Sequence, residues 1–242
     1  TGTNVTANPS DTTTYTITGT SNNCSSTAVV TVNVNPTPVV VITPPSSAYC
    51  DGGSVDLVAS GAATFDWLPA TGLSSATGSN VTANPTATTT YTITGTSTGC
   101  TDDETITVTV YPNPVVSFAA NDTVGCQPLC VDFANNSTIT SGTITGYFWD
   151  LGDGNTSTAT SLNHCYSDSG TYTVELTATS DNSCVTKLTK PDYITVNPLP
   201  VVTVNSPTVC PGQTAALTAI GATTYTWSAG ATSTGVNTAD AS

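Results

Sequence analysis

Methionine and arginine are missing from this sequence, and only two lysines and one histidine accompany 16 acidic residues. The formal net charge of −14 argues against nucleic acid as a partner, because phosphate binding needs clustered cations that release counterions. It argues equally against an anionic membrane surface. No apolar run approaches the roughly 18 residues of a membrane-spanning helix, so we expect no membrane insertion. With neither methionine nor a signal peptide, we interpret the chain as a processed product or a segment of a longer polypeptide.

Helix-forming residues are also scarce, whereas threonine, serine, asparagine and glycine are abundant. Threonine is β-branched and suits a pleated, half-exposed surface. Val30, Val32 and Val34 alternate with polar residues, and this period of two predicts strands with one face in water. Many short strands between glycine, proline and asparagine turns predict an all-β chain of immunoglobulin-like sandwiches with almost no helix.

The sequence repeats itself. Thr3–Cys24 and Ser79–Cys100 agree at 17 of 22 positions, at an offset of 76 residues. Tyr49–Trp67 resembles Val209–Trp227 at an offset of 160. Proline-rich joints at 35–38, 111–114 and 197–200 punctuate the chain, and proline stiffens such joints.

These echoes predict four parts, which are the C-terminal half of an immunoglobulin-like repeat (1–36), a complete repeat (37–112), a sandwich of another kind (113–198) and the N-terminal half of a repeat (199–242). The repeat is marked by a cysteine, a tryptophan, a late tyrosine and a second cysteine, here Cys50, Trp67, Tyr91 and Cys100. It resembles the immunoglobulin-like repeats of very large secreted surface proteins, such as the gliding-motility adhesins of Bacteroidetes.

The third part carries a sharper signature. Residues 147–180 read YFWDLGDGNTSTATSLNHCYSDSGTYTVELTATS. This resembles the PKD domain, whose pattern is W-D-F-G-D-G, then H-x-Y, then G-x-Y-x-V. Leu151 replaces the usual phenylalanine, and Cys165 lies inside the H-x-Y element. The resemblance implies a seven-stranded sandwich that serves as a spacer or interaction module in extracellular proteins.

Eight cysteines in a chain with few other reactive side chains indicate disulfides in an oxidising compartment rather than metal. A domain of about 76 residues with few aromatics buries a thin core, and a disulfide is the expected supplement. We expect a bond between Cys50 and Cys100. Four cysteines of the PKD-like part allow three pairings, of which we favour Cys126–Cys184 with Cys130–Cys165.

Cys24 and Cys210 then remain. By repeat position Cys24 corresponds to Cys100, and Cys210 to Cys50. Either their partners lie in sequence beyond this chain, or the half repeat 199–242 joins the half repeat 1–36 of a neighbouring copy, with Cys210 bonded to its Cys24. The second interpretation leaves about ten redundant residues, because 233–242 and 1–10 occupy overlapping repeat positions.

Two groups of residues could carry chemistry. His164 has no accompanying nucleophile motif, and the PKD pattern implies a structural role for it. Asp150, Asp153 and Asn155 could ligate calcium, which prefers oxygen ligands. The alternative is turn chemistry, in which aspartate side chains cap their own backbone.

Aromatic residues and glycan acceptors offer further candidates. Trp67, Trp149 and Trp227 could stack on sugars, but each lies in an alternating strand, where an inward tryptophan is a core anchor. Glycan candidates are the sequon asparagines Asn4, Asn80 and Asn121, together with Thr123, whose D-T-V context resembles the O-linked acceptor pattern of Bacteroidetes surface proteins.

We therefore predict a non-enzymatic building block of an extracellular, cell-surface filament or adhesin stalk. It needs no cofactor unless the calcium site exists. Its expected partners are copies of itself or adjoining repeats end to end, and glycans. The alternative is an accessory spacer or binding region of a large secreted hydrolase, which the PKD resemblance also implies.

Overall fold

The computed structural model describes residues 2–228. Every regular element in that range is a β-strand, so the all-β prediction is confirmed. The chain forms two compact units. The first combines Thr1–Val115 with Ile139–Thr145 and Thr179–Val185, and the second consists of Val116–Thr138, Gly146–Ala178 and Thr186–Ser242.

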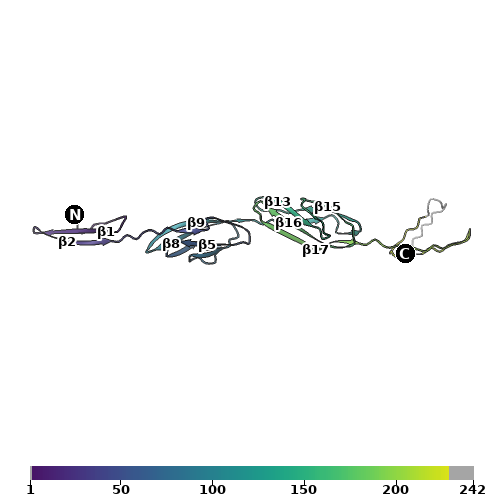
Figure 1. Cartoon of the computed structure of the whole chain (residues 1–242), viewed down its shortest axis with the longest axis horizontal. Helices are drawn as coiled ribbons and strands as arrows, with labels where there is room; N and C mark the ends of the chain where they lie inside the picture. Colours follow the sequence, from purple (N-terminus) through teal and green to yellow (C-terminus); the bar gives the residue numbers. More distant parts are fainter. Residues whose placement is uncertain (1, 229–242) are drawn as a thin grey trace. The chain divides into compact units, whose positions relative to one another are not determined.

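A complete sandwich occupies residues 41–111 of the first unit, and Figure 1 labels three of its strands. One sheet has the order β3-β5-β7 and the other β4-β9-β8-β6. The strands are β3 (Val41–Thr43), β4 (Ser47–Cys50), β5 (Val55–Ser60), β6 (Thr64–Leu68), β7 (Asn80–Ala83), β8 (Thr89–Ser97) and β9 (Cys100–Tyr111). All pairs are antiparallel except β4 with β9, which run parallel.

The core of this sandwich follows the alternation in the sequence. Tyr91 and Ile93 of β8 are fully buried, while the threonines between them face outward. Trp67 is 1% exposed, and its indole Nε1 donates to the carbonyl oxygen of Gly78 at 2.9 Å. The hydroxyl of Tyr91 donates to the carbonyl of Thr71 at 2.8 Å. Both aromatic side chains therefore fill the core with their apolar bodies while their polar tips are satisfied.

A second sandwich follows. Its sheets have the orders β10-β12-β15 and β11-β17-β16-β13-β14. The strands are β10 (Phe118–Ala120), β11 (Val124–Cys126), β12 (Leu129–Asn135), β13 (Ile144–Asp150), β14 (Thr156–Ser157), β15 (Leu162–Tyr166), β16 (Gly170–Ser180) and β17 (Val185–Asn197). Trp149, Phe133 and Tyr166 are at most 1% exposed and centre its core. The tryptophans of both complete sandwiches are thus core anchors.

Two short hairpins lie outside the sandwiches. β1 (Thr13–Ser21) pairs with β2 (Cys24–Val32), and β18 (Thr203–Val204) pairs with β19 (Ala219–Ile220). Each is a two-stranded sheet among the described residues. A lone two-stranded sheet has no second layer to bury its apolar face.

Gly61 provides a test of the close packing in the first sandwich. Its φ is +96°, and a Cβ there would clash with the carbonyl oxygen of Val39. Gly52 has a similar φ of +87°, but a Cβ there meets open space. We expect Gly52→Ala to cost about 1 kcal/mol from the left-handed backbone alone, and Gly61→Ala a further 1–3 kcal/mol or so from overpacking. Hydrogen exchange of peptides from β5 and β6 measures both, and equal losses would contradict the clash.

Candidate functional site

The feature with the clearest functional consequence is the bond between Cys50 and Cys184 in the first unit. Cys50 ends β4 and lies in parallel register with Tyr111, the last residue of β9. Cys184 follows the turn after β16, where its N–H donates to the hydroxyl of Ser180 at 3.1 Å. The two Cα atoms are 5.6 Å apart, within the usual disulfide range. The bond joins residues that are 134 positions apart in sequence.

The expected bond between Cys50 and Cys100 is wrong. Cys100 begins β9, whereas Cys50 lies beside Tyr111 at its other end. Tyr111 is 11 residues beyond Cys100 (111 − 100). At about 3.3 Å per residue, the two cysteines are separated by roughly 36 Å, while a disulfide needs Cα atoms within about 7 Å.

The same geometry corrects the pairing of Cys126 with Cys184. Cys126 ends β11 in parallel register with Asn197, the last residue of β17. Cys184 immediately precedes the first residue of that long strand. Cys130 and Cys165, in contrast, lie directly opposite each other on β12 and β15, and the structure bonds them as expected.

Four cysteines in the described range are unbonded, namely Cys24, Cys100, Cys126 and Cys210. Cys126 has the same place beside β17 that Cys50 has beside β9. Cys100 lies in the turn before β9, as Cys184 lies before β17. The thiol of Cys100 donates to the carbonyl oxygen of Asn35 at 3.6 Å. Asn35 corresponds to Tyr111 at the offset of 76, so this thiol faces a proline joint.

The cysteine geometry was missed from the sequence, although a signal for it exists. Once strand order is known, the cysteines fall into two kinds: one ends the strand that runs parallel to the last strand, and the other precedes the last strand. Sequence spacing alone shows only that they alternate. The parallel register of β4 with β9 shows that these two kinds lie at opposite ends of one sandwich.

Asp153 and His164 form an ion pair within the PKD-like signature. The His164 Nε2 lies 2.7 Å from the Asp153 Oδ2, and both side chains are about 15% exposed. Burial alone would raise the pKa of Asp153, but hydrogen bonds from Asn155 and His164 outweigh it and hold that pKa below its ordinary value. The ring of His164 packs edge-on against Tyr166, whose hydroxyl donates to the carbonyl of Leu151. His164 is therefore part of a structural network.

The carboxylates proposed for calcium act in turns. The Asp150 Oδ1 accepts from the N–H of Gly152 at 3.0 Å, and the Asp153 Oδ1 accepts from the N–H of Asn155 at 3.0 Å. In residues 2–228 no group of three or more histidine, cysteine or acidic side chains could hold a metal ion. The calcium site stays a prediction, and the turn-capping alternative describes the observed geometry.

We expect Asp153→Asn to weaken the second sandwich in a pH-dependent way. A carboxylate with a depressed pKa contributes stability that is present above its unfolded pKa, near 4, and is lost as the pH falls through the folded value. The variant should be about 1–3 kcal/mol less stable at pH 7, and the gap should close below pH 4 or so. Thermal unfolding at several pH values measures this, with the exposed Asp168→Asn as control. A gap that persists undiminished in acid would contradict the assignment.

The candidate glycan acceptors lie at the surface. Asn4, Asn80 and Asn121 are exposed and Thr123 is half-buried. The side chain of Asn121 accepts from the N–H of Asp132 at 2.7 Å. Glycosylation stays a prediction at these positions.

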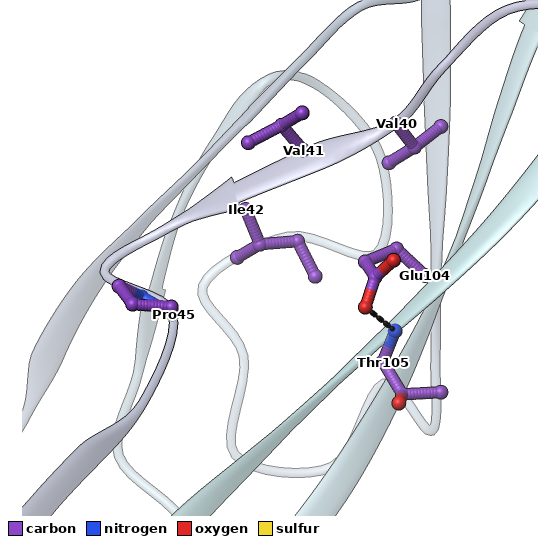
Figure 2. A pocket seen from close by; sticks show the side chains of 6 residues that line it. All are labelled: Val40, Val41, Ile42, Pro45, Glu104 and Thr105. Atoms are coloured by element: carbon purple, nitrogen blue, oxygen red, sulfur yellow. Dashed lines mark hydrogen bonds between the residues drawn. The ribbon is translucent and has the colours of Figure 1, made fainter.

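A shallow groove runs along β3 (Figure 2). Val40, Val41 and Ile42 line one side and Glu104 and Thr105 the other, and the Glu104 Oε1 accepts from the N–H of Thr105 at 3.2 Å. A ligand site normally gathers several convergent polar groups, whereas this groove offers one carboxylate bound to its own neighbour. No helix that could cross a membrane is found in the range that the structure describes.

Comparisons with known proteins agree with this architecture. Residues 111–196 match the model of the PKD domain family, which confirms the PKD-like part. A microbial collagenase of Vibrio alginolyticus is 36% identical over 77 residues, and this match spans 31% of the chain and 9% of the collagenase. The chain is therefore similar to a small part of that protein.

Solved structures are similar as well. The PKD1 domain of Vibrio anguillarum Epp is 29% identical, with a TM-score of 0.32, and the match covers 35% of this chain and 96% of that one. The N-terminal eight immunoglobulin domains of Down syndrome cell adhesion molecule align with 79% of this chain and 28% of theirs, at 14% identity and a TM-score of 0.53. The second likeness shows tandem immunoglobulin-like folding and no more.

Proposed function

We propose that this chain is a structural segment of an extracellular surface filament or adhesin stalk, built from disulfide-linked β-sandwich repeats. The observation that carries the proposal is the Cys50–Cys184 bond. It links a cysteine of the repeat 37–112 with one inside the PKD match 111–196. Tension that enters before Cys50 and leaves after Cys184 passes through this covalent bond.

The surface chemistry supports the same function. A chain with 16 acidic and two basic residues repels its neighbours sideways, which keeps repeated domains soluble. Cys130–Cys165 adds a second covalent link inside the PKD-like sandwich. Disulfides persist in oxidising environments, which supports an extracellular location. In this proposal the chain is not an enzyme, and its partners are adjoining repeats or further copies.

A second function has one specific observation in its favour. The match to a microbial collagenase supports an accessory region of a secreted hydrolase. In that case the polypeptide that carries this chain must also contain a catalytic domain.

Microscopy and peptide mapping of native material separate the two functions. Antibodies against this chain should label fibres on the surface of the source cells in the electron microscope. The antigen recovered from those fibres should yield peptides of repeated β-sandwich sequence. Diffuse label in the culture medium, together with peptides of a catalytic domain in the same polypeptide, would overturn the structural function and favour the accessory one.

A further inference from the structure

The β1–β2 hairpin has the sequence and the register of a core face, but nothing in the described chain covers it. At the offset of 76 residues, Ile17 corresponds to Ile93 and Val30 to Ile106. The pairing Ile17↔Ala28 likewise matches Ile93↔Glu104. Ile93 and Ile106 are at most 2% exposed, whereas Ile17 is 52% and Val30 50% exposed. The hairpin is therefore half of a sandwich.

The segment 201–221 is the other half. Thr203↔Ile220 repeats the register of Val41↔Ser60 in β3 and β5. Gly221 repeats Gly61, because both have positive φ and both lie against a carbonyl, that of Val201 and that of Val39 respectively.

This second half also leaves its core face in solvent. Val204 and Leu217 are 58% and 57% exposed, whereas the residues at their positions in the complete sandwich, Ile42 and Leu57, are 6% and 0% exposed. The exposed apolar face of β18 and β19 is thus the one that a hairpin like β8–β9 covers in the complete sandwich. In this chain the hairpin of that sequence is β1–β2.

The cysteines fit the same junction. At the joint of Tyr111, Cys50 lies beside the joint residue and bonds to the cysteine that precedes a later last strand, Cys184. At the joint of Asn197, Cys126 lies beside the joint residue but is exposed and unbonded. At the joint of Asn35, the opposite member is present, because the thiol of Cys100 lies against the Asn35 carbonyl. Each open joint has one cysteine and lacks the other.

From these observations, and resting on the proposed function, we infer that copies of this chain join head to tail. Residues 199–228 of one copy complete the sandwich begun by the β1–β2 hairpin of the next. Two disulfides lock the junction, Cys210 to Cys100 of the next copy and Cys126 to Cys24 of the next copy.

The repeat positions dictate these pairings. Cys210 corresponds to Cys50, so in the joined sandwich it lies in parallel register with Asn35 of the next copy, where Cys100 already waits. Cys24 begins β2, as Cys100 begins β9, so it reaches the joint of Asn197 and meets Cys126. A bond between Cys210 and Cys24 fails for the reason that Cys50–Cys100 fails, because the two lie at opposite ends of one sandwich. All eight cysteines are then paired.

Each new bond forms by oxidation. Two thiols lose two protons and two electrons, and a small disulfide such as oxidised glutathione accepts them and becomes two thiols. All four cysteines are at least partly exposed, which thiol–disulfide exchange requires.

The test uses the purified full chain in a glutathione redox buffer. We expect a ladder of covalent oligomers on a non-reducing gel, which collapses to one band on reduction. Peptide mapping should recover the cross-links Cys210–Cys100 and Cys126–Cys24. Cys210→Ser together with Cys126→Ser should abolish the ladder, while Cys130→Ala with Cys165→Ala should leave it intact.

Two matched variants separate docking from random oxidation. Val30 and Val29 are neighbours on β2 and face opposite ways, since Val30 corresponds to the buried Ile106 and Val29 to the exposed Thr105. Val30→Asp should reduce ladder formation at least tenfold, and Val29→Asp should leave it unchanged. Monomers that keep four thiols, cross-links of other pairings, or equal behaviour of the two variants would overturn the inference.

Native material distinguishes this inference from the proposed function. If surface fibres contain the chain but its four cysteines are bonded to peptides of a different sequence, the structural function stands and the head-to-tail junction of copies is wrong. If the chain polymerises in vitro but the native polypeptide carries a catalytic domain and forms no fibres, the structural function is wrong.

Discussion

Replacing Trp67 with alanine is expected to lower the free energy of unfolding of the first complete sandwich by about 3–5 kcal/mol. Trp67 is 1% exposed and donates a hydrogen bond to Gly78. The truncation therefore opens a cavity between two sheets and leaves a backbone carbonyl without its donor. Hydrogen exchange of peptides from β6 and β8 measures the loss, since those strands open with the sandwich.

Trp227 supplies the matched control within the same chain. It has the repeat position of Trp67 but is only half-buried. In the monomer, Trp227→Ala should cost about 1 kcal/mol or less, because little packing is lost. In the oxidised oligomer the cost should rise toward that of Trp67→Ala, because the next copy then covers the sheet. Equal costs of the two variants in the monomer would show that the segment 199–228 already forms its own core.

Periodicity explains why the core could be predicted. Each strand alternates between an apolar and a polar face, and burying the apolar face requires no knowledge of distant residues. Tyr91 and Ile93 could be placed inward from the letters alone, and Trp67 and Trp149 could be identified as anchors because each lies in an alternating strand beside a turn. The motif around Asp153 and His164 could likewise be assigned a structural role before its hydrogen bonds were known.

The disulfides could not be predicted in this way. A bond between cysteines depends on which strand ends meet, and this depends on sheet order and on parallel or antiparallel register. Cys130 and Cys165 were accessible because a short antiparallel pair brings them opposite each other. Cys50 and Cys100 flank one repeat in sequence, and this suggested a bond within the repeat. The parallel pairing of β4 with β9 reverses that conclusion, because it carries Cys50 to the far end.

The Cys50–Cys184 bond should also determine how far the chain extends under load. When the two ends of the chain are pulled in an optical trap, the 134-residue separation between these cysteines is bypassed by the disulfide. At about 3.4 Å per residue of extended chain, removal of the bond should add roughly 450 Å of contour length to the fully unfolded molecule. Cys50→Ser with Cys184→Ala removes it genetically, and a reductant removes it from the wild type.

The second disulfide provides the control for this extension. The loop between Cys130 and Cys165 spans 35 positions and lies inside the bypassed segment. Cys130→Ala with Cys165→Ala should therefore add no contour length while Cys50–Cys184 is intact, although it should lower the stability of the second sandwich by about 4 kcal/mol. Once Cys50–Cys184 is also removed, the same pair of substitutions should add about 120 Å. Identical lengths with and without the Cys50–Cys184 bond would show that tension does not pass through it, and a covalent link that carries no tension would leave the load-bearing function without its structural basis.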